Sequence, residues 1–475
     1  MAIRSSIFPS NALRKHARFA ATIGALALVS ACASDQPGVA GPSSRADASR
    51  EGVPSVDASR EGVPSNEGLV SPVWQQKARD LVAGAGFSPL AAGRAYPLLG
   101  VAQYLAVQRA EAAVGVPNTK SADASGNGIG SGGRLSQRRS SRTNADRDDR
   151  DDRGLRDHRE LRESGQRLET DRGAVAGASV VVLSYLFPAS VQMLEDLVTA
   201  QANAGPGQPQ AAFAAGEAIG RAAGAEMVAH GRVDGFSNPN TAVAPLGPGF
   251  WTSSTDPATP TAGGQLPGMT RWFLTSANQF RLGPPPTFGG AAFNAVLAEI
   301  RQISDTRTAE QIQIANFWAL NPGTPTPPGF WLDQASQEIA AHGLSEREAT
   351  HVFALVSSTV ADALIGCWDS KLTYWFIRPW NADPGITTLA TVGRPNHPSY
   401  PSGHSCVSSA AAEVLSTFFP ERRTDLEAMV IQAGLSRMYA GIHYRTDIEG
   451  GQNLGRSVAL FTIAADRSGK SVLSH

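Results

Sequence analysis

The sequence predicts an all-α fold, a helical bundle with long proline- and glycine-rich loops. Apolar residues recur with helical spacing in many segments, and no segment keeps the two-residue alternation of a half-buried strand. Pro/Gly-rich stretches at 236–290 and 320–330 separate the helical patterns. The 475 residues carry a net charge of −1, which argues against a nucleic-acid-binding protein.

Residues 1–32 have the features of an export signal with a lipobox. Basic residues precede an apolar run from Phe19 to Val29, which is too short to span a bilayer, and small residues precede Cys32. The segment resembles a bacterial lipoprotein signal. This implies lipidation of Cys32 and an exported protein, lipid-anchored to the outer membrane or periplasmic. The alternative is a plain secretory signal that is cut after Ala33.

Residues 33–68 have the composition of a low-complexity linker. The unit DASREGVPS occurs at 47–55 and again at 57–65, and it is too polar to form a core. We expect the folded domain to cover residues 69–475.

A charged insertion is expected to interrupt this domain at residues 117–172. The segment is first Gly/Ser-rich and then Arg/Asp-rich, so we expect disorder or at most a charged helix. A nucleic-acid-binding arm is disfavoured because acidic residues nearly cancel the arginines.

The stretch 173–194 carries no charged residue and has the length of a membrane span. Pro188 and several polar residues interrupt it, so a buried core helix is the preferred interpretation. Further helical patterns continue to the C-terminus and include the two remaining cysteines, Cys367 and Cys406. Two buried free thiols are favoured over a disulfide, which the sequence leaves open.

The segment KLTYWFIRP contains the first group of candidate site residues, Lys371 and Arg378. Their seven-residue spacing predicts that they share one face of a helix that Pro379 ends. Aromatic and apolar residues lie between them and indicate burial, and buried cations need an anionic partner. Asp362 and Asp369 flank this segment, and either could pair with a site arginine.

The segment PSGHS places Ser402, Gly403 and His404 at the start of a predicted helix. Unpaired N–H groups and the helix dipole favour an anion there, and the prolines before Ser402 restrict the approaching loop. A simple N-cap serine with an incidental histidine is the alternative.

The segment SRMYAGIHYRTD contains Arg437, His443 and Asp447. Asp447 follows His443 by four residues, one helical turn, and could accept its Nδ1 proton so that Nε2 is free. Arg437 offers a planar fork that fits oxyanions. Together the three segments predict a pocket for a tetrahedral oxyanion, with one histidine to attack or ligate it and one to transfer a proton.

These motifs resemble the signature of the type 2 phosphatidic acid phosphatases and vanadium-dependent haloperoxidases, the PAP2 superfamily. The matching residues are Lys371, Arg378, Pro379, Pro401, Ser402, Gly403, His404, Ser436, Arg437, His443 and Asp447. The segments PPPTFGG, IANFWAL, PPGFW and ADALIGCWDSK extend the resemblance to the soluble bacterial haloperoxidase-like branch. The resemblance implies a helical bundle of the PAP2/vanadium haloperoxidase type.

For a haloperoxidase, the resemblance implies a vanadate cofactor with His443 as its metal ligand. Lys371, Arg378, Ser402, Gly403 and Arg437 would bind its oxygens, and His404 would handle protons. Such an enzyme oxidises a halide with hydrogen peroxide, the metal acting as a Lewis acid. His397 is the halide-site candidate, because algal bromoperoxidases have histidine there and chloroperoxidases tend to have an aromatic residue. Bromide or iodide, and then an organic acceptor, are therefore the expected substrates.

Two alternatives remain at this point. A PAP2-type acid phosphatase would use His443 to attack a phosphate ester through a phosphohistidine, with Asp447 orienting it and His404 protonating the leaving group. A tethered oxyanion-binding lipoprotein without turnover would need neither His404 nor the His443–Asp447 pair. The absence of clear membrane spans in the mature sequence favours the haloperoxidase over the polytopic lipid phosphatases.

Overall fold

The computed structural model describes residues 68–115, 145–204 and 210–474, with the side chains of 145–163 left out. The predicted signal, Cys32 and the linker lie outside these residues. The first half contains α1 Ser71–Gly84, α2 Pro89–Ala113, α3 Ala145–Leu186, η1 Pro188–Ser190, α4 Val191–Asn203, α5 Gln210–Val233 and η2 Leu266–Gly268. The second half contains α6 Ala291–Thr306, α7 Ala309–Phe317, α8 Thr326–His342, α9 Glu346–Tyr374, α10 Pro379–Ala382, α11 Gly403–Phe418, η3 Pro420–Arg422, α12 Arg423–Tyr439 and α13 Arg445–Arg467. The described residues form no β-strand, which confirms the all-α prediction.

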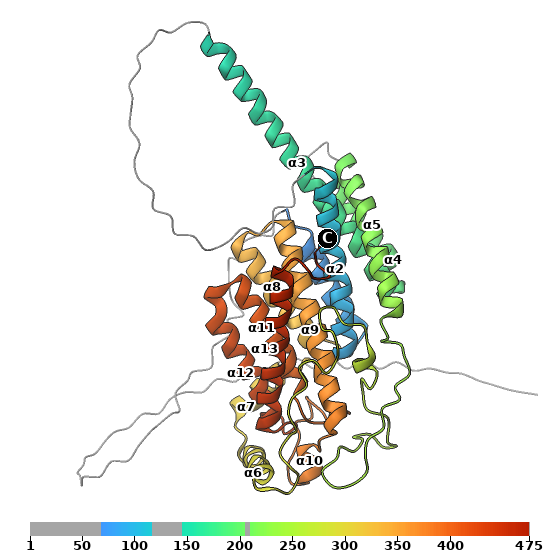
Figure 1. Cartoon of the computed structure of the whole chain (residues 1–475), viewed down its shortest axis with the longest axis vertical. Coiled ribbons are helices and arrows are strands. Elements are labelled where there is room, and N and C mark those ends of the chain that lie inside the picture. The colour runs from blue at the N-terminus through green and yellow to red at the C-terminus, as the bar shows by residue number, and fades with distance from the viewer. Residues whose placement is uncertain (1–67, 116–144, 205–209, 475) are drawn as a thin grey trace, which may run out of the picture. The chain divides into compact units, whose positions relative to one another are not determined.

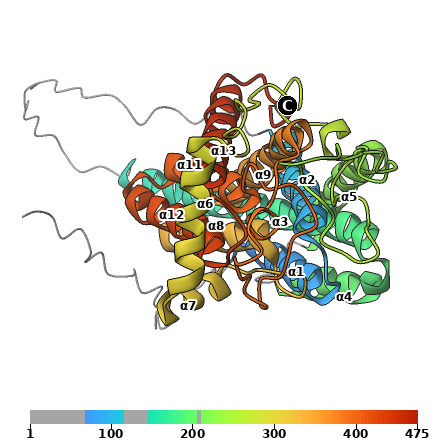
Figure 2. The ribbon, with the colours of Figure 1, turned by 90° about the horizontal axis from the view of Figure 1, so that it is seen from below.

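Helix α9 lies at the centre of the bundle. It packs against α2 on one side and against α11, α13 and α8 on the other, while α3 and α5 pack together beside α2 (Figure 1, Figure 2). Ser345 caps its start through a capping box with Glu348. Among the described helices, only α9 is long and apolar enough to span a membrane, and 94% of its most apolar window is buried in the protein. Its apolar length is therefore accounted for by its position in the core.

Helices α3 and α5 approach each other closely because glycines face each other along their contact. A Cβ atom at Gly216 would lie 1.9 Å from the carbonyl oxygen of Thr170, and one at Gly173 would lie 2.0 Å from that of Phe213. The α3 segment that includes Glu169–Arg172 is buried in this packing. Residues 145–172 are helical, which agrees with the charged helix expected as the alternative and not with disorder. At Glu169–Arg172, helix–helix packing outweighs the unfavourable composition.

The stretch 173–194 contributes to the core as expected. Helix α3 ends at Leu186, two residues before Pro188, and α4 begins at Val191.

The long loop between α5 and α6 is held against α9 by the side chain of Asp362. Its carboxylate accepts hydrogen bonds from three successive backbone N–H groups, those of Trp272, Phe273 and Leu274, at 2.8–3.0 Å. Asp362 therefore fixes this loop and does not pair with a site arginine.

Candidate active site

The candidate site lies at one end of the bundle, where α9 ends and both α11 and α13 begin. The chain leaves α9 after Tyr374 through Trp375, whose positive φ of 46° breaks the helix. Lys371 therefore lies on the last turn of α9, whereas Arg378 lies outside it and directly precedes α10. The prediction that the two share one helix face is wrong, because the left-handed residue Trp375 redirects the chain.

The ammonium group of Lys371 is fully buried and faces the loop before α11. Its Nζ atom donates to the carbonyl oxygens of Pro398 at 2.7 Å and Ser399 at 2.9 Å, and also to that of Pro401. Burial lowers the pKa of Lys371 to about 8. Lys371 thus holds the loop that leads to Ser402 as well as carrying positive charge into the site.

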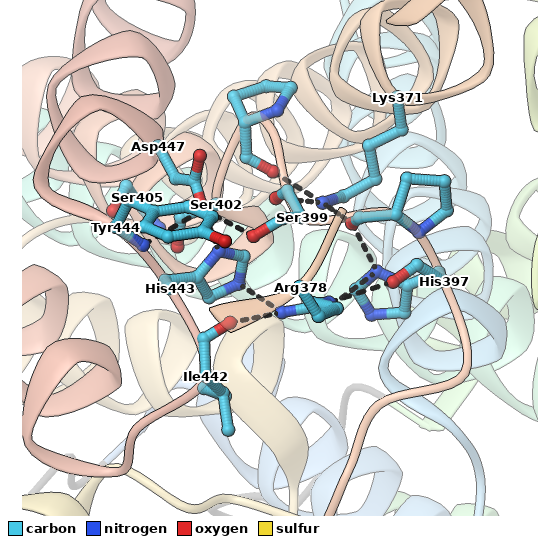
Figure 3. A network of polar contacts seen from close by, with 12 residues as sticks. Lys371, Arg378, His397, Ser399, Ser402, Ser405, Ile442, His443, Tyr444 and Asp447 are labelled. Atoms are coloured by element: carbon cyan, nitrogen blue, oxygen red, sulfur yellow. Dashed lines mark hydrogen bonds and ion pairs between the residues drawn. The ribbon is translucent and has the colours of Figure 1, made fainter. Parts of the chain in front are cut away.

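Arg378 joins two of the three histidines of the site, His397 and His443, as Figure 3 shows. Its Nη1 atom lies 3.1 Å from Nε2 of His443 and 2.6 Å from the carbonyl oxygen of Ile442. Its Nη2 atom lies 3.1 Å from Nδ1 of His397, and its Nε donates to the His397 carbonyl oxygen at 2.9 Å. Since a guanidinium can only donate, each of these two ring nitrogens must accept. Nδ1 of His397 therefore does not donate to the carbonyl oxygen of Pro398, 3.3 Å away.

His443 and Asp447 form a buried pair across the start of α13. Nδ1 of His443 donates to Oδ2 of Asp447 at 2.8 Å, and the same oxygen accepts the backbone N–H of Tyr444 at 3.1 Å. His443 precedes the helix, so the pair does not span a turn within it as predicted, although the contact itself is present. The Asp447 bond places the proton on Nδ1 and directs the Nε2 lone pair toward Arg378. Burial and the nearby cations keep the pKa of His443 well below its usual range.

Ser402, Gly403 and His404 form the start of α11. Ser402 is the N-cap residue, and its Oγ accepts the N–H of Ser405 at 3.4 Å. The first N–H groups of the helix have no intrahelical acceptor and point toward the end of the bundle where the site lies. Nε2 of His404 donates to the carbonyl oxygen of Trp318 at 2.9 Å, so its Nδ1 is the nitrogen left for proton exchange.

Arg437 lies on the last turn of α12 and is 1% exposed. Its Nε donates to Oγ of Ser436 at 2.9 Å, and its Nη2 donates to the carbonyl oxygen of Ala315 at 3.2 Å. Both partners are uncharged, and burial lowers the pKa of Arg437.

The site has an excess of buried positive charge. Lys371, Arg378 and Arg437 are each at most 1% exposed, and none of them forms a salt bridge within the described parts of the chain. Burial lowers the pKa values of all three cations; the charge of Asp447 partly opposes this for Lys371 and Arg378, and no acid opposes it for Arg437. Buried cations without matching anions are costly, so the arrangement is suited to binding an anion.

Sequence reasoning missed several neighbours of the site. Ser399 donates to Asp447, and the carbonyl groups of Trp318 and Ala315 hold His404 and Arg437. Sequence analysis could not find these carbonyl groups, because no residue type marks a backbone carbonyl that binds a side chain.

Asp369 forms a bidentate ion pair with Arg281 at 2.6 and 2.7 Å, so it too is not the partner of a site arginine. Cys367 and Cys406 are buried free thiols next to the site.

The model of the PAP2 superfamily matches residues 350–468, which include every motif residue of the site. Over these residues, which make up less than half of its length, the chain is similar to the PAP2 superfamily. A non-specific acid phosphatase from Providencia stuartii is 27% identical over 175 residues, 35% of this chain and 66% of that protein. One from Salmonella typhi is 40% identical over 57 residues, 12% of this chain and 23% of that protein. The matched regions thus span less than two thirds of either phosphatase.

Solved structures extend the likeness over most of the chain. A bacterial vanadium-dependent iodoperoxidase has a TM-score of 0.62 and 23% identity, covering 82% of this chain and 95% of its own. A bacterial vanadium-dependent chloroperoxidase has a TM-score of 0.51 and 15% identity, covering 64% and 83%. At these identities the likeness concerns the fold, and it confirms the predicted bundle of the PAP2/vanadium haloperoxidase type.

Proposed function

We propose that this chain is a vanadium-dependent haloperoxidase-like enzyme that oxidises bromide or iodide with hydrogen peroxide. The observation that carries the proposal is the set of three buried cations, Lys371, Arg378 and Arg437, whose charges act on His443, with Nη1 of Arg378 3.1 Å from its Nε2. The fold shared with an iodoperoxidase over 95% of that chain supports it.

The residues present fit vanadate. Three buried cations exceed the single carboxylate beside them, and the start of α11 adds N–H donors, so a multiply charged oxyanion would balance the site. His443 would ligate the metal through Nε2. Lys371, Arg378, Arg437 and the Ser402–Gly403 helix start would hold the oxygens, after Lys371 and Arg378 exchange some present partners. Bound vanadate would supply Lewis acidity toward hydrogen peroxide.

The protein's own groups would then serve proton transfer and orientation. Asp447 keeps the proton of His443 on Nδ1 and so preserves the Nε2 lone pair for ligation. His404 would exchange protons through Nδ1, because its Nε2 is engaged by the Trp318 carbonyl. His397 lies beside Arg378 and 5.0 Å from the ring of Trp368, which suits a residue that contacts halide at the edge of the site.

The identity to non-specific acid phosphatases favours a second candidate, hydrolysis of phosphate monoesters. Nε2 of His443 would attack phosphorus, and His404 would protonate the departing alkoxide. Water would then cleave the phosphohistidine to release phosphate. Phosphate and vanadate share shape and similar charge, so the same pocket serves both reactions.

One assay separates the two reactions. The purified chain is loaded with orthovanadate, and peroxide-dependent oxidation of bromide and iodide is followed, with phosphate as competitor. Oxidation that requires vanadate and falls as phosphate is added supports the proposal. A folded, vanadate-binding chain that oxidises neither halide but hydrolyses phosphate esters when free of vanadate would overturn it in favour of the phosphatase.

We also propose that the chain is exported and lipid-anchored through Cys32, on the basis of the basic, apolar and small-residue order that precedes it. Expression with a labelled fatty acid tests this. Label on the wild-type chain that is lost in Cys32→Ser supports the anchor, and equal absence of label in both contradicts it.

A further inference from the structure

Ser399 connects the first and third motifs of the site and lies two residues before the second, although it belongs to none of them. Its Oγ donates to Oδ2 of Asp447 at 2.5 Å, and its backbone N–H donates to the carbonyl oxygen of Phe376 at 2.9 Å. Its own carbonyl oxygen accepts from Nζ of Lys371 at 2.9 Å. Figure 3 shows Ser399 between Lys371 and Asp447. One buried residue thus bonds to the end of α9, to the segment after it and to the start of α13.

The hydroxyl of Ser399 acts on the carboxylate that orients His443. Oδ2 of Asp447 accepts from Ser399, from Nδ1 of His443 and from the N–H of Tyr444, whereas Oδ1 has no partner in the described parts of the chain. All hydrogen bonds that fix this carboxylate therefore converge on one oxygen. His443 and Tyr444 lie within four residues of Asp447, whereas Ser399 is 48 residues away. Without the Ser399 hydroxyl, the Asp447 carboxylate would lose its donor from the loop and could rotate about the Cβ–Cγ bond.

The loop that carries Ser399 is well placed to transmit this constraint. Pro398 and Pro401 flank the serine and restrict the backbone, and Lys371 binds the carbonyl oxygens of both prolines. The N–H of Ser402 donates to the backbone carbonyl oxygen of Asp447 at 2.9 Å. The loop is therefore bound to Asp447 at two points, one through a side chain and one through the backbone.

We propose that Ser399 is a positioning residue that locks Asp447, and through it the ring and tautomer of His443, so that Nε2 faces the oxyanion pocket. The proposal rests on the proposed function only in taking His443 as the reacting group, since the contacts themselves belong to the anion-free protein. Ser399 touches neither substrate nor cofactor in this role.

The test compares Ser399→Ala, which removes the donor, with Ser399→Thr, which keeps a hydroxyl. Ser358→Ala is the matched control, because Ser358 is equally buried but donates only to carbonyl groups of its own helix α9. NMR of the anion-free, ¹⁵N-histidine-labelled chains reads the Nδ1–H resonance of His443, assigned by its loss in His443→Gln. The steady-state rate is measured in parallel for whichever reaction the wild-type chain catalyses, halide oxidation or phosphate-ester hydrolysis. Thermal unfolding checks that each variant is folded.

We expect Ser399→Ala to lose the slowly exchanging Nδ1–H signal and to lower kcat by about 10–100-fold, the usual cost of removing an outer-shell partner. Ser399→Thr should restore both, and Ser358→Ala should change neither. If the alanine variant does not fold, Ser399→Cys, a weak donor, should weaken the signal instead. An unchanged His443 signal in folded Ser399→Ala or Ser399→Cys would overturn the inference. A wild-type chain with the signal but no turnover would instead contradict the proposed function.

Discussion

Nδ1 of His443 lies 2.8 Å from Oδ2 of Asp447, and both side chains are buried. A neutral amide at position 447 would weaken this bond and remove a negative charge from a cation-rich site. We predict that Asp447→Asn lowers turnover about 10–100-fold, as for other outer-shell partners of a ligating histidine. The measurement is the steady-state rate of the reaction that the wild-type chain catalyses, halide oxidation or phosphate-ester hydrolysis. Asp369→Asn, which breaks only the Arg281 ion pair, should retain near wild-type rates; equal losses in both would contradict the role of Asp447.

Arg437 carries buried charge with only uncharged partners, so it should cost stability in the absence of an anion. We predict that Arg437→Met unfolds at the same or a higher temperature than wild type without ligand. Saturating orthovanadate should stabilise wild type by about 2.7 kcal/mol at 100 times its Kd and the variant far less. Thermal unfolding with and without vanadate measures both effects.

The exposed Arg301 provides the control for this experiment, since it pairs with Asp305 and Asp383 away from the site. Arg301→Met should leave the response to vanadate unchanged. A ligand-free Arg437→Met that is much less stable than wild type, yet still responds fully to vanadate, would show that Arg437 supports the fold and does not bind the anion.

His404 is predicted to serve turnover more than binding. We expect His404→Ala to lower turnover by about 10²–10⁴-fold, the usual contribution of a general acid or base. Its affinity for vanadate should change much less, because the cations and the start of α11 remain. Equilibrium titration with vanadate beside the rate measurement separates the two. Unchanged turnover in the variant would instead fit an anion-binding protein whose His404 is incidental.

Asp171 predicts a pH-dependent stability away from the site. Burial raises the pKa of its carboxyl from 3.8 to about 7. At pH values between these two pKa values, the folded chain keeps a proton on Asp171 that the unfolded chain releases. The protonated Asp171 therefore contributes its full share to the free energy of unfolding below about pH 4, and this share falls as the pH rises to about 7. At about 1.36 kcal/mol per pKa unit, Asp171→Asn should gain about 2–4 kcal/mol relative to wild type between pH 4 and pH 8.

Urea unfolding of wild type and Asp171→Asn at both pH values gives this difference directly. Comparing the two chains cancels the titration of other carboxyl groups. A free-energy difference between the chains that is the same at pH 4 and pH 8 would contradict the raised pKa of Asp171.

The fold was predictable from the sequence where the helical pattern was strong and apolar. Helix α9 and the helices after it follow such patterns, and Ser345 caps α9 as a capping box should. The close packing of α3 from Thr170 onward was not predictable, because it depends on glycine contacts with α5 that no local pattern reveals. Composition indicated disorder or at most a charged helix up to residue 172, and tertiary packing buries Glu169–Arg172 in a helix.

The site residues could be identified by type and spacing, but their connections could not. The seven-residue spacing of Lys371 and Arg378 fits a helix face, yet Trp375 takes a positive φ that its residue type does not favour. Ser399 carries no signal of its own, since a serine between two loop prolines usually marks a turn. Its bond to Asp447 joins positions 48 residues apart and becomes visible only in three dimensions.

The central claim is that His443 and the three buried cations form one oxyanion site. A crystal structure of the chain grown with orthovanadate tests it most directly. We expect vanadium bonded to Nε2 of His443, with its oxygens among Lys371, Arg378, Arg437 and the start of α11. Vanadate bound elsewhere, or an intact pocket that stays free of vanadium at saturating concentration, would contradict the claim.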